Sequence, residues 1–401
     1  MEKASLHQKI IELSTDQKEL KELLSSTIDL LRFPLAIMVI FIHMNPQVIN
    51  LIDADFNLFS GRGIYNMTQI VGSHVLSHIA VPTFYLISGF LFFNYNFNKW
   101  SWNTYRRKIK ARIRTLFIPY IMWNLLPFLL LLLTMLGGVI LYDKPAEGIT
   151  QLIKEKSWHI FYDCNEWGTT RVNWLGEHLR MTGPYDLPLW FLRDLIVVTL
   201  LTPPIYYAIK YFKICFVLFL FIAYVSRIWI LTPGFNITAF FFFSTGAYFA
   251  LNELSMVSFA CQYKFLFIPL SIILFIITTI YDGCNTVIGQ NVYPLFVCSG
   301  VFTAFIIGSW CIRKWNIKPN KFLVQCCFFI YAFHALKIPI LGRPFERTNG
   351  VLHLLIPGVS GIEDGFCYVI TPFISAFVCI CVLMIARKIF PKLTFLFSGN
   401  K

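Results

Sequence analysis

Two ionisable side chains in one apolar segment are the first residues that could do chemistry. Arg32 and His43 lie eleven residues apart in an otherwise hydrophobic run. In a helix this spacing corresponds to three turns plus about 20°, so both side chains project from one face, about 16 Å apart along the axis. Asp29, one turn before Arg32, is close enough to pair with the guanidinium. Because histidine exchanges a proton near neutral pH, His43 is suited to act as a general base on a hydroxyl.

Both side chains also have a structural interpretation. Arg32 could be an anchor that reaches the cytoplasmic membrane interface. His43 lies deeper, where an interface is hard to reach, and its alternative role is a hydrogen bond to a neighbouring helix. Since an ionisable group inside an apolar span is costly unless it faces the bundle or a water cavity, each is a functional candidate.

The composition shows which elements must position these side chains. Of 401 residues, 57% are hydrophobic and 14% are charged, and the mean hydropathy is +0.63. Soluble domains carry charges on about a quarter of their residues, so the chain is membrane-embedded. The eleven cysteines lie mostly in apolar segments and lack the spacing of a metal site, so no metal is expected.

Apolar runs long enough to cross the membrane recur along the chain. Only a helix satisfies its own backbone hydrogen bonds in hydrocarbon, so each run predicts a transmembrane helix. The sequence therefore predicts an all-α polytopic bundle of ten transmembrane helices. Their approximate bounds are 28–45, 78–96, 115–138, 188–207, 214–231, 235–252, 265–281, 293–311, 326–342 and 365–387.

The distribution of Lys and Arg predicts the orientation. Cytoplasmic connections keep an excess of Lys and Arg, and the densest basic stretch lies between Lys99 and Arg114. Both termini are therefore predicted to be cytoplasmic, and the net charge of +13 needs no nucleic acid to explain it. Residues 1–24 predict a charged surface helix that begins at Ser14, residues 25–390 the membrane domain, and residues 391–401 a short cytoplasmic tail.

Other polar residues inside the predicted spans are further candidates. Ser88 precedes Gly89, and this small pair could either serve the chemistry or simply allow two helices to pack closely. His334 is expected near mid-membrane in the ninth helix, with Lys337 one turn further out. Catalytic and structural roles for His334 both remain open.

The start of the fourth helix offers a candidate acceptor site. Trp190, Arg193 and Asp194 lie where it meets the predicted outer interface. The long outer loop 142–187 before it is rich in aromatic and acidic residues, which suits stacking on a sugar and hydrogen bonding to it. The alternative is an interfacial tryptophan beside a partly solvated ion pair.

These motifs, in their order, resemble the acyltransferase-3 family of polytopic membrane enzymes, which modify bacterial surface carbohydrates and some other acceptors. The resemblance spans about residues 28–387. The matching segments are Arg32 with His43, Tyr85 to Phe90, the basic run from Arg106 to Tyr120, Leu189 to Leu192, and Tyr331 with His334.

The resemblance implies transfer of an acyl group, usually acetyl, from cytoplasmic acyl-CoA to a hydroxyl of an extracytoplasmic carbohydrate or glycolipid. Acetyl-CoA would be a co-substrate, and no tightly bound cofactor is expected. The chain would lie in the plasma membrane of a bacterium, among its lipids. The roles we assign are catalytic for His43, Arg32, Asp29, His334 and Ser88, donor-binding for Arg32, Arg106, Arg107, Arg112 and Arg114, and acceptor-binding for Trp190, Arg193 and Asp194.

Two other classes of protein would also need polytopic helices and buried charges. One is a transporter or flippase of a lipid-linked sugar or small metabolite, which performs no covalent chemistry. The other is a non-catalytic receptor or assembly subunit. No inverted repeat and no pair of Gly- or Pro-broken helices favours transport, and the presence of Asp29, Arg32 and His43 favours an enzyme.

Overall fold

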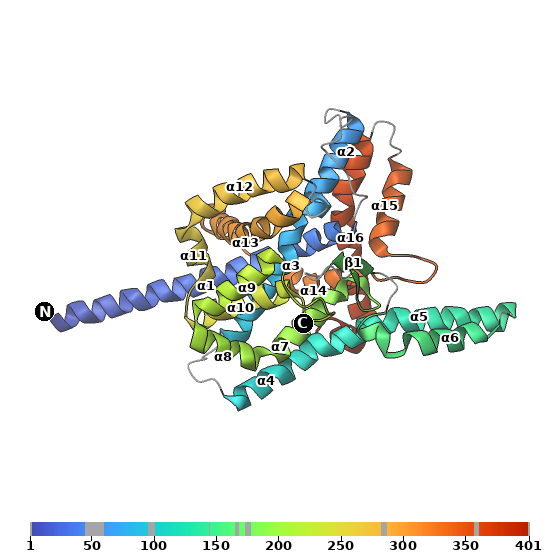
Figure 1. Cartoon of the computed structure of the whole chain (residues 1–401), viewed down its shortest axis with the longest axis horizontal. Coiled ribbons are helices and arrows are strands. Elements are labelled where there is room, and N and C mark those ends of the chain that lie inside the picture. The colour runs from blue at the N-terminus through green and yellow to red at the C-terminus, as the bar shows by residue number, and fades with distance from the viewer. Residues whose placement is uncertain are drawn as a thin grey trace.

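The computed structural model describes residues 2–44, 60–94, 101–143, 145–164, 168–172, 178–281, 287–356 and 361–399. Helices dominate these residues, with one short β-hairpin beside them (Figure 1). The helices of the first half are α1 (Glu2–His43), α2 (Gly61–Gln69), η1 (Ile70–Val75), η2 (Leu76–Ile79), α3 (Ala80–Phe93), α4 (Trp102–Arg112), η3 (Ile113–Phe117), α5 (Ile118–Tyr142), α6 (Glu147–Lys156), η4 (Ser157–Phe161), η5 (Leu187–Leu189), α7 (Trp190–Leu200) and α8 (Thr202–Phe212).

The second half is also helical. Its helices are α9 (Ile214–Ser226), α10 (Ile237–Leu251), α11 (Met256–Gln262), α12 (Lys264–Ile280), α13 (Val287–Trp315), α14 (Lys321–Phe333), α15 (Pro344–Leu355), α16 (Ile362–Ile389) and α17 (Pro391–Phe397). Strands β1 (Gly168–Val172) and β2 (His178–Thr182) pair antiparallel, with Gly168 opposite Thr182.

Multiple long apolar helices make the chain an integral multi-pass membrane protein. In the described residues, five helical stretches are long and apolar enough to span a membrane, and two bent helix pairs raise the number to seven. The pairs are α7 with α8, bent by 62°, and α11 with α12, bent by 80°. Helices α9, α10 and α14 are apolar but shorter. Each of the ten predicted segments overlaps a helix, while ten crossings and the orientation stay predictions.

The first helix differs from the prediction. Helix α1 runs without a break from Glu2 to His43, so Ser14 does not begin a helix, and the predicted boundary at residue 24 falls inside α1. Figure 1 shows its N-terminal part extending away from the body. Pro34 lies inside the helix. A membrane helix tolerates proline when its neighbours satisfy the freed backbone groups, and the helical spacing of Arg32 and His43 is thus retained.

The ninth predicted segment is wrong in its extent. Helix α14 ends at Phe333 and not near residue 342, so His334 is its C-cap and Lys337 lies beyond the helix. Pro339 disfavours helical geometry in the residue before it, and Ile340 and Gly342 both have positive φ. These residues turn the chain back, which places His334 at the end of a helix.

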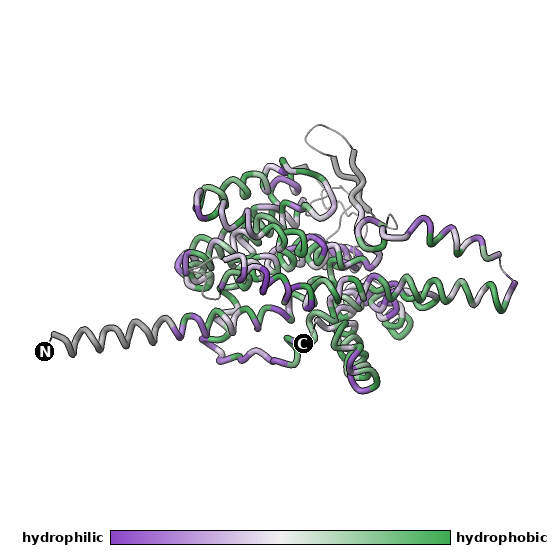
Figure 2. Tube along the Cα trace, turned by 90° about the horizontal axis from the view of Figure 1, so that it is seen from below, coloured by the Kyte–Doolittle hydropathy of each residue, from purple (hydrophilic) through white to green (hydrophobic). Residues whose placement is uncertain are grey.

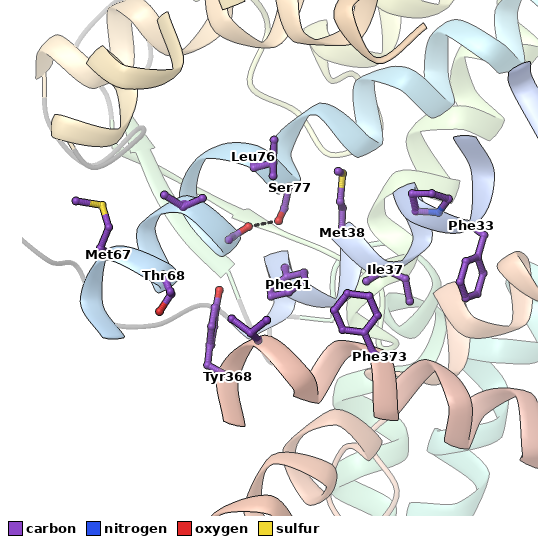
Figure 3. Close-up of a pocket in the computed structure, with 14 residues that line it drawn as sticks. Phe33, Ile37, Met38, Phe41, Met67, Thr68, Leu76, Ser77, Tyr368 and Phe373 are labelled. Atoms are coloured by element: carbon purple, nitrogen blue, oxygen red, sulfur yellow. Dashed lines mark hydrogen bonds between the residues drawn. The ribbon is translucent and has the colours of Figure 1, made fainter. Parts of the chain in front are cut away.

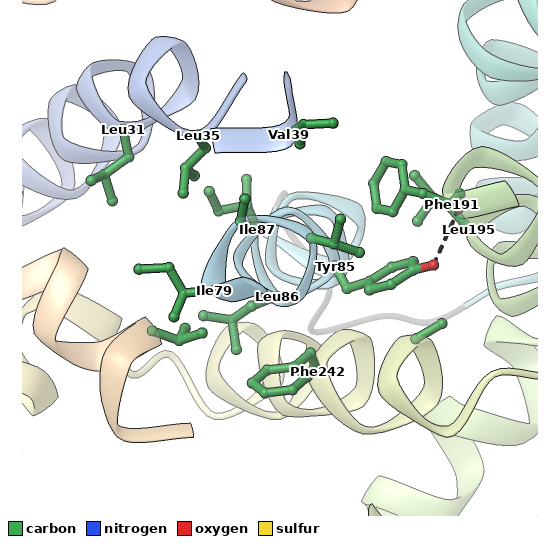
Figure 4. Close-up of a cluster of buried hydrophobic side chains, with 14 of the residues drawn as sticks. Leu31, Leu35, Val39, Ile79, Tyr85, Leu86, Ile87, Phe191, Leu195 and Phe242 are labelled. Carbon is green, nitrogen blue, oxygen red and sulfur yellow. Dashed lines mark hydrogen bonds between the residues drawn. The ribbon is translucent and has the colours of Figure 1, made fainter. Parts of the chain in front are cut away.

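The core is built around α3. Figure 4 shows α3 end-on between α1, which contributes Leu31 and Leu35, and α10, which contributes Phe242 on the opposite side. Two glycines allow α3 and α10 to touch. A Cβ atom at Gly89 would lie 2.0 Å from the Phe243 carbonyl oxygen, and one at Gly246 would lie 2.0 Å from that of Leu86. The packing interpretation of the Ser88-Gly89 pair therefore holds for its glycine.

This contact predicts that Gly89→Ala destabilises the protein. A Cβ atom would force two backbones apart, and overpacking of this kind costs about 1–3 kcal/mol. The matched control is Gly137→Ala in α5, where a Cβ atom meets nothing within 4 Å and where alanine favours a helix. Unfolding in mixed detergent micelles should show a loss of stability for Gly89→Ala only. Equal stability of the two variants would contradict the close contact.

The loop before the fourth predicted span is a folded structure. It contains α6, η4 and the β-hairpin, and α6 packs back along α5. Figure 2 shows α5 as largely hydrophobic, whereas hydrophilic residues interrupt α6. Trp158 and Tyr162 of this loop are described, and their rings lie 6.1 Å apart. Its other two tryptophans, Trp167 and Trp174, lie outside the described residues.

Candidate active site

A cationic cluster lies around Arg32, eleven residues before the C-terminal end of α1. Arg32 Nη1 lies 2.9 Å from Asp29 Oδ1, as the spacing predicted. Arg112 lies close enough to Arg32 for their like charges to interact. Its guanidinium and the ammonium of Lys108 also lie over the ring of Phe92, at 6.0 and 5.2 Å from the centroid. Two guanidinium groups held near one another form a site suited to an anion.

The other predicted donor-binding arginines are more exposed than Arg112. Arg106, Arg107 and Arg114 are exposed, whereas Arg112 is partly buried. All four lie on α4 and η3, but a helix points its residues in different directions. The structure therefore brings Arg112 to Arg32 and leaves the other three on the surface.

At the C-terminal end of α1 two histidine rings lie close together. The ring centroids of His43 and His334 lie 5.1 Å apart, with 47° between the ring planes. His334 is fully buried, and its Nδ1 lies 2.9 Å from the Ile330 carbonyl oxygen. A carbonyl can only accept, so Nδ1 carries the hydrogen and Nε2 of the neutral ring has a free lone pair. This Nε2 has no hydrogen-bond partner within the described structure.

Two further residues approach the histidine pair. Arg343 and His78 lie within electrostatic range of His43. Arg343 precedes α15, and its Nε is buried without a partner among the described residues. The sequence analysis missed Arg343 because an arginine before a proline in a connection is an ordinary surface residue. Only the turn after α14 brings it beside the end of α1.

Asp186, which the sequence analysis also missed, is 1% exposed. Within the part of the chain that the structure describes, neither of its carboxylate oxygens has a hydrogen-bond partner. Burial raises the pKa of Asp186 well above its ordinary value, while the charge of Arg343 opposes this rise. An aspartate just before a helix is typical of an N-cap, and Asp186 occupies that position before η5, but its side chain makes no capping bond.

Ser88 lies nearer to the cationic cluster around Arg32 than to the histidine pair. It is half-buried on α3, one turn before Phe92, whose carbonyl accepts a hydrogen bond from Lys108. His78, near His43, precedes Ser88 by ten residues, or about 15 Å of helix. The structure therefore does not bring Ser88 to the histidine pair.

Arg193 and Asp194, the ion pair predicted to bind the acceptor, form hydrogen bonds within the protein. Arg193 donates to Asp194 Oδ1 through Nε and Nη2 at 3.1 and 3.0 Å. Its Nη1 donates to the carbonyl oxygens of Tyr162 and Thr182 at 2.8 and 3.2 Å. Both residues of the pair are buried, so the alternative of a partly solvated pair is wrong. Their contacts tie the loop before α7 to the bundle. Trp190, half-buried, begins α7.

The residues described contain no group of three or more His, Cys, Asp or Glu side chains that could hold a metal ion. The chemistry that the site offers comes from imidazole, carboxylate and guanidinium groups. Such groups move protons and stabilise negative charge.

A cavity of about 530 Å³ lies on a different face of α1 (Figure 3). Ile37, Met38 and Phe41 of α1 line it, facing Tyr368 and Phe373 of α16. At 100° per residue, these α1 positions lie roughly opposite the face that carries Arg32 and His43. The cavity is almost wholly apolar, and it is separate from the histidine pair and the cationic cluster.

The fold and the site together define a class of protein. It is an integral membrane protein in which one helix carries a cationic cluster, suited to an anion, and eleven residues further on a histidine pair, suited to proton transfer. Residues 26–387 match the model of the acyltransferase-3 family, which is described as an acyltransferase domain. The chain belongs to the acyltransferase-3 family and is an acyltransferase, as the resemblance predicted. This membership argues against a transporter or a non-catalytic subunit.

A curated relative matches the chain over nearly its whole length. The chain is 23% identical over 396 residues to the succinoglycan biosynthesis protein ExoH of Rhizobium meliloti (strain 1021). The match covers 94% of this chain and 92% of that protein. No solved structure matches.

Proposed function

We propose that this enzyme transfers an acyl group, in the first instance acetyl, from cytoplasmic acyl-CoA to a hydroxyl of an extracytoplasmic carbohydrate or glycolipid. One observation carries the proposal. One face of helix α1 carries a cationic cluster, Arg32 with Arg112, and eleven residues further on a histidine pair, His43 with His334. The relative named for succinoglycan biosynthesis supports a polysaccharide as the acceptor.

The distance between the two ends suits acyl-CoA. Arg32 and His43 are separated by about 16 Å along α1, a distance comparable to the pantetheine arm. Phosphate groups held by Arg32 and Arg112 would then leave the thioester near His43. Guanidinium groups favour phosphate because they present several donors in a fixed plane. With the predicted orientation, the nucleotide enters from the cytoplasm and the acceptor from the opposite side.

The reaction needs one proton removed and one returned. His43 takes the proton of the acceptor hydroxyl as its oxygen attacks the thioester carbonyl carbon. The carbon–sulfur bond then breaks, and the leaving thiolate receives the proton to give CoA. His334, whose ring centroid lies 5.1 Å from that of His43, keeps a lone pair on Nε2 that would stabilise the imidazolium formed on His43 by accepting a hydrogen bond from it. Asp29 holds the guanidinium of Arg32 for the donor.

The first experiment measures release of CoA thiol from acetyl-CoA. The purified full-length protein in nanodiscs would be tested with and without a crude surface-glycan extract. We expect release that the extract stimulates and that transfers labelled acetyl to the glycan. Absence of both release and acetyl-CoA binding, from a protein shown to be folded, would refute acetyl-CoA as the donor.

The cationic cluster predicts a donor-binding defect in Arg112→Gln. Loss of one charge-assisted contact to phosphate should raise the KM for acetyl-CoA about tenfold to a hundredfold. The matched control is Arg114→Gln, which removes an exposed arginine from the adjoining turns and should change this KM less than about twofold. Steady-state kinetics with the extract at saturation would measure both variants. Equal effects of the two substitutions would assign binding to the general charge of the loop.

A further inference from the structure

The carboxylate of Asp186 is an unused hydrogen-bond acceptor in a fully buried position. Its backbone N–H donates to Asn124 Oδ1 at 3.0 Å, which fixes the residue in place. Neither carboxylate oxygen has a partner within the described structure. An unpaired buried carboxylate is costly, because it has lost its water and gained nothing in exchange.

Two tyrosine hydroxyls near Asp186 are already occupied. Tyr120 and Tyr331 are close enough to feel its charge. Tyr331 Oη donates to the Pro188 carbonyl, and Tyr120 Oη donates to that of Phe161. The side-chain N–H of Asn124 donates to the Tyr120 carbonyl at 2.9 Å. The protein thus surrounds the carboxylate with polar groups that leave both of its oxygens for an external donor.

Arg343 links this carboxylate to the reaction site. It lies within electrostatic range of Asp186 and, independently, of His43. Two of its nitrogens differ in their surroundings: Nη1 pairs with Glu346 Oε1 at 2.8 Å, while Nε is buried without a partner among the described residues. His334 Nε2 is another buried atom without a partner among the described residues. Asp186, Arg343 and His334 thus each carry a buried polar atom without a partner among the described residues, and Arg343 and His334 both lie near His43.

We propose that Asp186 and Arg343 form the acceptor subsite of this enzyme, a site for a polyol such as a sugar ring. The two oxygens of Asp186 accept hydrogen bonds from hydroxyl groups of the ring, and Arg343 Nε donates to one of its oxygens. A carboxylate suits this task because it accepts from several hydroxyls at once. The bound ring presents a further hydroxyl to His43. This inference rests on the proposed function and adds the residues that bind and select the acceptor.

The test is Asp186→Asn, which keeps the shape of the side chain but replaces one acceptor oxygen with a donor. The probe is the crude surface-glycan extract, with CoA release as the readout. We expect the extract concentration that gives the half-maximal rate to rise about tenfold to a hundredfold. The KM for acetyl-CoA should stay within about twofold. A structural role would change the KM for acetyl-CoA together with the half-saturating extract concentration, or lower the yield of folded protein.

Controls separate the possible outcomes. Asp143→Asn removes an exposed carboxylate at the end of α5 and should leave every parameter unchanged. Arg343→Gln should reproduce the acceptor defect, whereas Glu346→Gln, which breaks only the exposed pair, should not. If Asp186→Asn fails to fold, Arg343→Gln carries the test. If folded Asp186→Asn and Arg343→Gln both keep the wild-type extract concentration for the half-maximal rate, the subsite is overturned. If the wild-type protein shows no CoA release that the extract stimulates, the proposed function itself is overturned.

Discussion

Converting His43 to alanine should abolish acyl transfer and leave the protein folded. General acid–base catalysis contributes about 10²–10⁴-fold, so we expect a loss of at least about a hundredfold in the rate of CoA release. The side chain lies at the end of α1, where its ring faces His334, so truncation disturbs little of the core. The rate, measured with saturating acetyl-CoA and glycan extract, gives the effect on kcat.

The control for this variant is another histidine of the same fold. His353 on α15 is partly exposed and lies 3.3 Å from Asp364, and His353→Ala should keep nearly full activity. His334→Ala should also lose activity, because His43 then lacks the neighbouring base. Normal transfer by well-folded His43→Ala would end the mechanism proposed for α1.

Breaking the buried ion pair of α7 should have the largest effect on stability. Arg193→Met leaves the carboxylate of Asp194 buried without its guanidinium, and loss of one partner of such a pair costs about 3–5 kcal/mol. The substitution also frees the carbonyls of Tyr162 and Thr182. Unfolding in mixed detergent micelles would measure the difference.

Two further variants complete this experiment. Asp163→Asn breaks the partly exposed His159–Asp163 contact and should cost less than about 1 kcal/mol. The double variant Arg193→Met/Asp194→Leu removes both charges. Its loss of stability should be smaller than the sum of the losses caused by Arg193→Met and Asp194→Leu alone. An intact stability together with a higher KM for the glycan would instead restore the acceptor-binding role that the sequence predicted for this pair.

The two aspartates near the start of α7 show the limit of sequence reasoning. Asp194 lies beside Arg193, and local spacing makes an ion pair plausible, but burial and the bonds to two carbonyls come from a distant loop. Asp186 precedes a helix, which predicts a cap, yet its carboxylate makes no such bond. The difference arises because neighbours from other helices decide whether a polar atom is paired.

The sequence by itself determined the membrane class, the helical segments and the alignment of Arg32 with His43. Apolar length and helical period are local properties, since a backbone in hydrocarbon has to satisfy its own hydrogen bonds. The tertiary structure decided which polar groups meet. It places Arg112, of the four arginines on α4 and η3, close to Arg32, and it ends α14 early so that His334 is its C-cap. It also brings Arg343 within electrostatic range of both His43 and Asp186. These contacts join residues far apart in the chain, and only packing of the whole bundle fixes such distances.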